Sequence, residues 1–153
     1  MDHLLLHAHP SVAAAARHFV TAWCTAHGLR ADVTDTTELL TSELVGNALR
    51  HGSGRIVVSI TDGAPAVLAP PAPHQVLVTV ADSGAGRPRT RPAPADATGG
   101  RGLHLVDALA RAWGVTPHAA PGTCHPPPPL TAAGLEGATG GKTAWFTVDA
   151  AGG

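Results

Sequence analysis

The sequence contains 153 residues, which suits one compact domain spanning 1–153 around a single core. Hydrophobic residues make up 44%, and the net charge of −1 argues against a general nucleic-acid binder and a polybasic membrane anchor. No apolar run approaches the ~20 residues that cross a bilayer, and the start lacks the basic region of a signal peptide. We therefore expect a cytoplasmic protein with no direct nucleic-acid or membrane contact.

The first half of the chain predicts a short strand followed by two helices. Three leucines at 4–6 indicate the strand. A helix is expected from Ser11 to a stop at Gly28, because apolar residues recur between them at helical spacing. A second helix is expected to be capped by Thr34 or Asp35, with Glu38 available for a capping-box contact, and to end before residue 52.

The second half supplies most of the predicted sheet. Strands are expected over 55–61, 75–81 and 142–149, with a further strand from Val115 and a helix over 102–113. Three segments rich in glycine and proline, at 62–74, 83–100 and 119–140, are expected to be flexible loops. This order predicts an α/β (α+β) two-layer sandwich, in which about three helices cover one face of a mostly antiparallel mixed sheet.

Cysteine and histidine spacing gives no metal site. Cys24 and Cys124 do not form a CxxC pair, which favours reduced, structural thiols. The ten histidines are scattered, without a helical HxxxH pair or a cluster of ligand spacing. A metal centre built on histidine is therefore not expected.

The first group of candidate functional residues lies on the second predicted helix. Glu43, Asn47 and His51 are spaced four apart, so they share one helix face. The amide oxygen of Asn47 suits Mg²⁺, which takes few protein ligands, and Glu43 could act as a general base on a hydroxyl or water. An isolated Glu–Asn pair of this spacing is more often part of a solvated polar face. The functional interpretation therefore depends on the other motifs.

The second group follows the strand predicted over 75–81. The carboxylate of Asp82 could accept a hydrogen bond from the exocyclic N–H of adenine, and Gly84 and Gly86 would let the backbone approach a flat base. An ordinary Asp-Ser-Gly turn is the alternative interpretation.

The third group opens the third predicted helix and comprises Gly99, Gly100, Arg101, Gly102 and Leu103. Glycines before a helix expose backbone N–H groups to an anion, and the helix dipole favours negative charge there. Arg101 could add a charge-assisted contact to phosphate. A flexible linker before a helix is the alternative.

A fourth motif, Gly141-Lys142-Thr143, invites a Walker A interpretation that fails. A P-loop needs glycine where Glu136 stands and a helix after the motif, whereas residues 144–148 have the pattern of a strand. Thr143 is instead expected on a core strand, with its hydroxyl near the Asp82 carboxylate.

Taken in order, these motifs resemble the N, G1 and G2 boxes of the GHKL ATPase superfamily, with the ATP lid between the last two. Within it, residues 42–52 (S-E-L-V-G-N-A-L-R-H-G) are most similar to the anti-sigma-factor serine/threonine kinases of partner-switching systems. Residues 11–20, with Arg17, and the late G-K-T-A-W-F strand agree with that branch. The resemblance covers residues 10 to 149. Segments 64–73 and 119–130 are additions to the family pattern, and the resemblance implies no role for them.

The resemblance implies ATP and Mg²⁺ as cofactors and assigns roles by position. Asn47 would coordinate Mg²⁺, Asp82 would recognise adenine, and Glu43 would activate the attacking serine hydroxyl. Thr143 would support the adenine contact, and His51 closes the N box. The nucleotide and its lid would be lined by Gly84, Gly86, Gly100, Arg101, Gly102 and Leu103.

This resemblance predicts a protein serine/threonine kinase that phosphorylates a small STAS-type anti-sigma-factor antagonist and regulates a sigma factor. It also makes a homodimer possible, because members of the family often dimerise. The alternatives are a non-catalytic ATP-binding regulatory module and a histidine-kinase-type ATPase domain. The latter is disfavoured because the chain shows no dimerisation helices or phosphoacceptor-histidine region.

Overall fold

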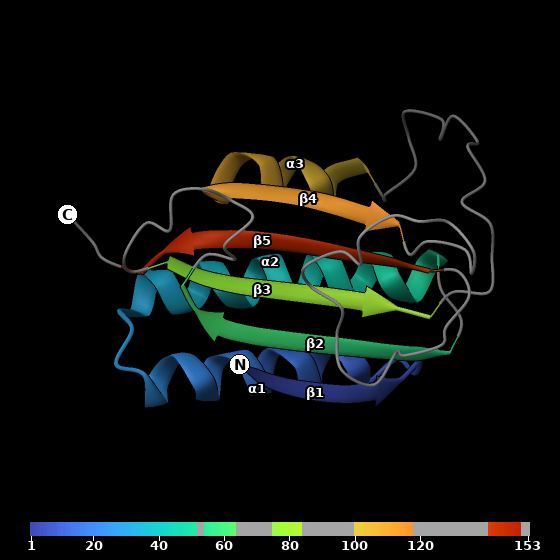
Figure 1. Ribbon diagram of the computed structural model, residues 1–153, viewed down its shortest axis with the longest axis horizontal. Coiled ribbons are helices and arrows are strands. Elements are labelled where there is room, and N and C mark those ends of the chain that lie inside the picture. Colours follow the sequence, from blue (N-terminus) through green and yellow to red (C-terminus); the bar gives the residue numbers. More distant parts are fainter. Residues whose placement is uncertain (52–53, 64–74, 84–99, 118–140, 151–153) are drawn as a thin grey trace, which may run out of the picture.

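The computed structural model describes residues 1–51, 54–63, 75–83, 100–117 and 141–150 (Figure 1). Most of the segments predicted as loops at 62–74, 83–100 and 119–140 lie outside the described residues. The elements in chain order are β1 (Asp2–His7), α1 (Val12–Ala26), α2 (Ala31–His51), β2 (Arg55–Asp62), β3 (Gln75–Asp82), α3 (Gly100–Leu109), β4 (Ala112–Pro117) and β5 (Lys142–Asp149).

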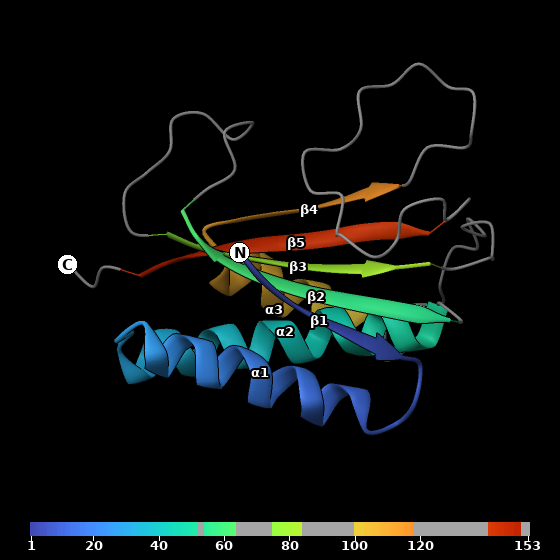
Figure 2. The same cartoon turned by 60° about the horizontal axis from the view of Figure 1, so that its bottom comes forward.

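The five described strands form one sheet in the order β1-β2-β3-β5-β4. Each neighbouring pair runs antiparallel, so the described part of the sheet is wholly antiparallel rather than mixed. All three helices lie against the same face of this sheet (Figure 2). The predicted two-layer α/β sandwich is therefore confirmed. Among the described residues, none of the helices combines the length and apolar character that a membrane span requires.

Helix α1 forms because small and apolar residues recur every three or four positions and face the core. Val12, Ala16 and Val20 are buried along this stripe. The chain leaves the helix at Gly28, whose φ of 68° is a conformation that glycine adopts without strain. The indole Nε1 of Trp23 donates a hydrogen bond to Asp2 Oδ2 at 2.7 Å, which ties the end of α1 to β1.

Helix α2 begins at Ala31, so the prediction of a cap at Thr34 or Asp35 was wrong. The backbone N–H of Thr34 already donates to the carbonyl oxygen of Arg30 at 3.0 Å, which places it inside the first turn. Asp32 supplies negative charge at this terminus and pairs with Arg30 at 2.8 Å. Glu38 makes no capping contact; its Oε2 accepts a hydrogen bond from Thr21 at 3.2 Å and joins α2 to α1.

The boundaries around α3 also differ from those predicted. The helix starts at Gly100 and ends at Leu109, and Trp113 belongs to β4 instead. The helix stops because the N–H of Arg111 donates to the carbonyl oxygen of Thr147 at 2.8 Å, which draws the chain onto β5. Because this contact joins residues far apart in the chain, no local sequence pattern marks the end of α3. The other strand predictions hold to within a few residues, with β2 extending through Asp62.

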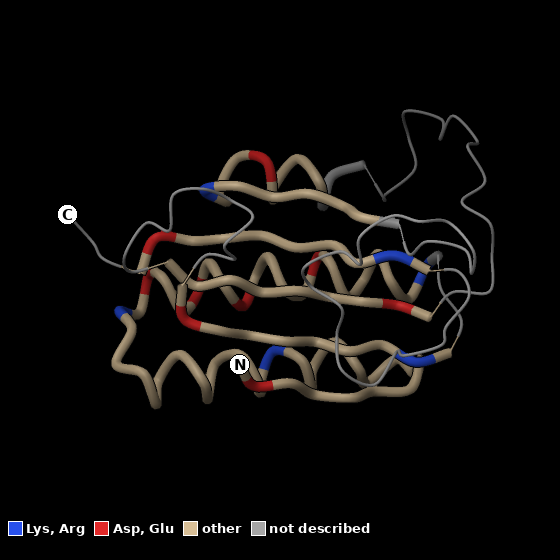
Figure 3. Tube along the Cα trace, in the orientation of Figure 1, with Lys and Arg blue, Asp and Glu red and all other residues tan. Residues whose placement is uncertain are grey.

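The core lies between the helices and the sheet face that they cover. Phe146, Leu40 and Ile60 are among its largest fully buried side chains. The opposite face of β4 carries Gly114, beneath the indole of Trp145. A Cβ at Gly114 would lie 2.8 Å from Cζ2 of Trp145, so glycine is what allows this close approach. Figure 3 shows the charged residues of β2, β3 and β5 at strand ends rather than along the central strands.

Candidate functional site

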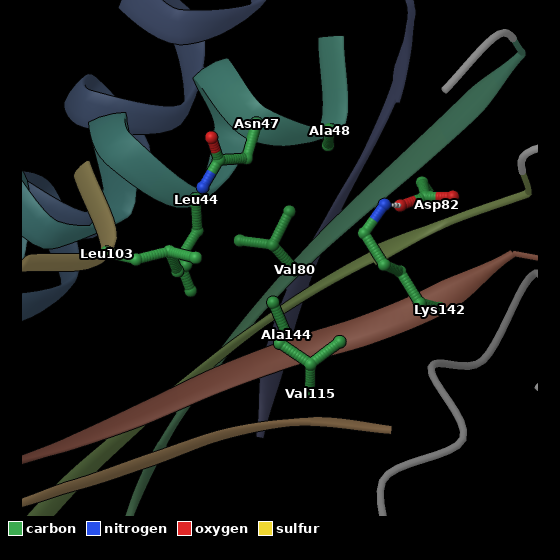
Figure 4. A pocket seen from close by; sticks show the side chains of 9 residues that line it. All are labelled: Leu44, Asn47, Ala48, Val80, Asp82, Leu103, Val115, Lys142 and Ala144. Atoms are coloured by element: carbon green, nitrogen blue, oxygen red, sulfur yellow. Dashed lines mark hydrogen bonds and ion pairs between the residues drawn. The ribbon is translucent and has the colours of Figure 1, made fainter. Parts of the chain in front are cut away.

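A cavity of about 130 Å³ lies between the helices and the sheet (Figure 4). We call it the central cavity. Six of its nine lining residues are apolar, so its walls are mostly hydrocarbon. The lining comprises Leu44, Asn47 and Ala48 from α2, Leu103 from α3, Val80 and Asp82 from β3, Val115 from β4, and Lys142 and Ala144 from β5.

Strand register and helix period explain why these side chains converge. In the register, Asp82 is opposite Lys142, and Val80 is opposite Ala144. Alternate residues of a strand share one face, so both pairs point toward the helices. On α2, positions 44, 47 and 48 have the spacing of one helix face. Leu103, in the first half of α3, closes the cavity on a further side.

Asp82 is the buried polar group at one end of the central cavity. Its side chain is 5% exposed, and its Oδ2 lies 3.0 Å from Nζ of Lys142, whose side chain is 31% exposed. Figure 4 shows the lysine stem reaching from β5 to the carboxylate. An ionised carboxylate is only an acceptor, so a ligand group that contacts Asp82 must present an N–H, an O–H or a cation.

Asn47 is the polar group that α2 contributes to the cavity. Its Oδ1 accepts a hydrogen bond from Nη2 of Arg50 at 2.7 Å, and its amide nitrogen is directed toward Leu44 in Figure 4. Glu43 is half-buried one helical turn earlier and does not line the cavity. Within the described part of the chain, the carboxylate of Glu43 has neither a hydrogen bond nor an ion pair.

The remaining predicted site residues fall into two groups. Thr143 lies fully buried on β5, opposite Ala81 rather than Asp82, and it is not among the cavity-lining residues. The others are described by backbone alone or lie outside the described residues. His51 is the last residue of α2; Gly100, Arg101 and Gly102 form the first turn of α3; Gly84, Gly86 and Gly99 are outside.

The structure also brings in residues that the sequence analysis did not assign to the site. Lys142 was considered only as part of a failed Walker A motif, and its placement at the start of β5 confirms that no helix follows that motif. The sequence does carry one signal, because Lys142 is the only lysine in the chain. The apolar walls at Val80, Val115 and Ala144 carry no such signal, since they resemble any core residue.

The residues of the central cavity fit a nucleotide and its magnesium ion. Apolar walls suit a flat heteroaromatic base, and the buried Asp82 carboxylate suits a base that carries an amino group. The described residues contain no cluster of three His, Cys, Asp or Glu side chains. A divalent ion here would therefore take most of its oxygens from phosphate and water, with the amide oxygen of Asn47 as a protein ligand of the kind that Mg²⁺ accepts.

Comparison with known proteins agrees with this geometry. A family model described as a histidine kinase-like ATPase domain matches residues 6–124, which include the end of β1, all of β2, β3 and β4, and helices α1, α2 and α3. A search of curated proteins gives no match. Strand β5, which contributes Lys142 and Ala144 to the cavity, lies beyond the matched residues. The matched span is more than half of the chain, and the chain therefore belongs to the histidine kinase-like ATPase family of the GHKL superfamily.

Proposed function

We propose that this protein binds Mg-ATP in the central cavity and transfers the γ-phosphate to a serine of a small STAS-type anti-sigma-factor antagonist. Through that antagonist it would regulate a sigma factor by partner switching. The observation that carries the proposal is the placement of Asp82 and Asn47 on opposite layers of one apolar cavity. Glu43, whose carboxylate has no partner among the described residues, lies one turn before Asn47.

Asp82 and the apolar walls would hold the base. The adenine amino group would donate to the Asp82 carboxylate, and Leu103 and Val80 would pack against the ring. Burial strengthens this hydrogen bond, because water does not compete for a carboxylate that is 5% exposed. Thr143, buried on the neighbouring strand, would support the same contact.

Asn47 and the start of α3 would position the phosphates. Bound magnesium would neutralise charge on the phosphate oxygens, with Oδ1 of Asn47 as its protein ligand. The backbone N–H groups of Gly100 and Gly102 lie in the first turn of α3, where the helix dipole favours an anion. In this proposal, Arg101 and His51 contact the phosphate side of the nucleotide, and Gly84 and Gly86 line it.

Glu43 would act as the general base. It would take the proton from the serine hydroxyl as that oxygen bonds to the γ-phosphorus, while the bond to the β–γ bridging oxygen breaks and ADP leaves. A carboxylate already committed to an ion pair would serve poorly in this role. The absence of such a pair at Glu43, within the described residues, supports the assignment.

Nucleotide binding is tested by calorimetry with Mg-ATP on the parent protein, Asp82→Asn and Asp62→Asn. The second variant makes the same chemical change at an exposed aspartate outside the cavity. We expect Asp82→Asn to weaken binding at least tenfold, because an amide is a weaker acceptor than a carboxylate, and Asp62→Asn to leave it unchanged. Equal binding by all three proteins would remove Asp82 from the site.

Phosphoryl transfer is tested with γ-labelled ATP and purified STAS-domain proteins from the same genome. Glu43→Gln should lower the transfer rate about a hundredfold or more while leaving the dissociation constant for ATP unchanged. Glu38→Gln is the matched control, since Glu38 is on the same helix and is engaged with Thr21. A Glu43→Gln variant as fast as the parent would exclude Glu43 as the base.

The alternative is a non-catalytic ATP-binding regulatory module. It is favoured by one observation: Arg50 engages the Asn47 oxygen and Lys142 engages the Asp82 carboxylate, so these two acceptors of the cavity already have cationic partners. Stoichiometric ATP binding without transfer to any STAS-domain protein would support this alternative over the kinase. Label appearing on a histidine instead of a serine would point to histidine-kinase-type chemistry.

A further inference from the structure

The ion pair between Lys142 and Asp82 lies where the proposed function puts the base. Nζ of Lys142 is 3.0 Å from Oδ2 of Asp82, and both residues line the central cavity. In Figure 4 the lysine stem rises from β5 and the ammonium group faces the carboxylate. The register explains the contact, because Lys142 is directly opposite Asp82 across β3 and β5.

We propose that Lys142 determines base affinity and specificity by occupying, on Asp82, the position that the amino group of an incoming base must take. The base then binds by exchange: its amino group replaces Nζ on the carboxylate, and the ammonium group moves out toward solvent. This inference rests on the proposed function, because it concerns the base subsite of the same cavity.

The unequal exposure of the two partners decides which one moves. The Asp82 side chain is 5% exposed and is fixed near the end of a central strand, whereas the Lys142 side chain is 31% exposed. A lysine ammonium group sits on a flexible four-carbon stem and is strongly hydrated, so it reaches water at little cost. The buried carboxylate cannot do so, and it needs a donor in place of the one that leaves.

The size of the cavity supports the same exchange. Its volume of about 130 Å³ is below the roughly 300 Å³ at the lower end of small-ligand pockets. The Lys142 side chain is one of the residues that line this small cavity, beside Asp82. Outward movement of Lys142 therefore lengthens the cavity on the side where the base edge meets Asp82.

The exchange makes the amino group of the base the feature that is selected. A base with a 6-amino group can replace the ammonium donor on the carboxylate, whereas the same base without that group offers no N–H in its place. Lys142→Met keeps most of the stem and removes the charge. It should bind adenosine about three- to tenfold more tightly than the parent, since the competing donor is gone. Affinity for purine riboside, which lacks the amino group, should not change.

Calorimetry with the two nucleosides tests this difference on four proteins. They are the parent, Lys142→Met, Lys142→Arg, which keeps a competing cation, and Arg111→Met, which makes the same charge change at an exposed residue outside the cavity. Only Lys142→Met should gain affinity, and only for adenosine. Unchanged or weaker adenosine binding by Lys142→Met would overturn the proposal. An equal gain for both nucleosides would also overturn it, because the gain would then come from space alone.

A second measurement covers the case in which Lys142→Met does not fold. Because Lys142 is the only lysine, reductive methylation with ¹³C-formaldehyde gives one dimethyl-lysine NMR signal in addition to that of the N-terminus. Saturation with adenosine should move this signal to the position seen in Asp82→Asn, where the anionic partner is removed. If adenosine or ATP binds and the dimethyl-lysine signal does not move, the role of Lys142 is overturned and the proposed function is not. Failure of ATP and adenosine to bind the parent overturns the proposed function and this inference together.

Discussion

Arg50 donates a hydrogen bond from Nη2 to Oδ1 of Asn47 at 2.7 Å, one helical turn along α2. Arg50 is exposed, whereas Asn47 is half-buried and lines the central cavity. The arginine thus holds the amide oxygen that the proposed function assigns to magnesium. Because an exposed hydrogen bond between side chains contributes about 1 kcal/mol or less to stability, it can be replaced by a stronger interaction at little cost.

This relationship predicts how magnesium acts on nucleotide affinity. The parent should bind ATP more tightly with Mg²⁺ than with EDTA, and Asn47→Ala should bind equally in both conditions. Arg50→Ala keeps the amide oxygen and should keep the magnesium dependence. Paired calorimetric titrations with and without Mg²⁺ measure the effect. An Asn47→Ala protein whose affinity still falls on chelation would place the ion elsewhere.

Filling the apolar part of the cavity should weaken ATP binding without lowering the stability of the protein. Ala144 lines the cavity and is almost fully buried, so Ala144→Leu would extend hydrocarbon into existing space. The melting temperature should stay within a few degrees of the parent value, because an available cavity reduces the cost of overpacking. ATP affinity should fall at least tenfold. Ala22→Leu, at an exposed site on α1, is the control and should leave ATP affinity unchanged.

Two glycine substitutions should change stability in opposite directions. Gly46 lies inside α2, and the nearest atom to an added Cβ is Nη2 of Arg50 at 3.9 Å, so Gly46→Ala should stabilise the protein by about 0.5–1 kcal/mol. Gly114→Ala would bring a Cβ to 2.8 Å from Trp145 and should destabilise it by about 1–3 kcal/mol. Urea unfolding measures both. Equal effects at the two sites would contradict the packing of Trp145 on β4.

The Cys24 thiol should make stability fall at alkaline pH. Burial raises the pKa of Cys24, although hydrogen bonds to Thr37 and Thr34 act in the opposite direction. Between the ordinary pKa and the raised one, the unfolded chain loses a proton that the folded chain keeps. The free energy of unfolding therefore decreases as pH rises through this window, by up to about 1.4 kcal/mol per pH unit. Cys24→Ala should lack this component, which urea titrations from pH 8 to pH 11 would detect as a difference in slope.

Much of the sheet could be predicted because its signals are local. The valine- and isoleucine-rich runs of β2 and β3 stand between glycine and proline clusters, and Asp82 follows the last apolar residue of β3. The spacing of Glu43 and Asn47 likewise fixes their shared helix face, whatever the tertiary fold. These features needed no knowledge of strand order.

Features set by distant contacts could not be predicted. Glu38 resembled a capping residue, but its partners Thr21 and Arg17 lie on another helix. The end of α3 depends on the carbonyl oxygen of Thr147, and the partner of Lys142 lies 60 residues earlier in the sequence. Such pairs follow from the register between β3 and β5, which a single sequence does not specify.

The position of β5 between β3 and β4 also constrains the order of events during synthesis. When the ribosome has added residue 117, β4 has been made, but β5, the only described strand with which it pairs, has not yet been translated. The nascent polypeptide can assemble β1, β2 and β3 in sequence, whereas β4 must wait for residues 142–149 to emerge. Addition of β5 and β4 to the sheet is therefore a late event, which follows translation of residue 149.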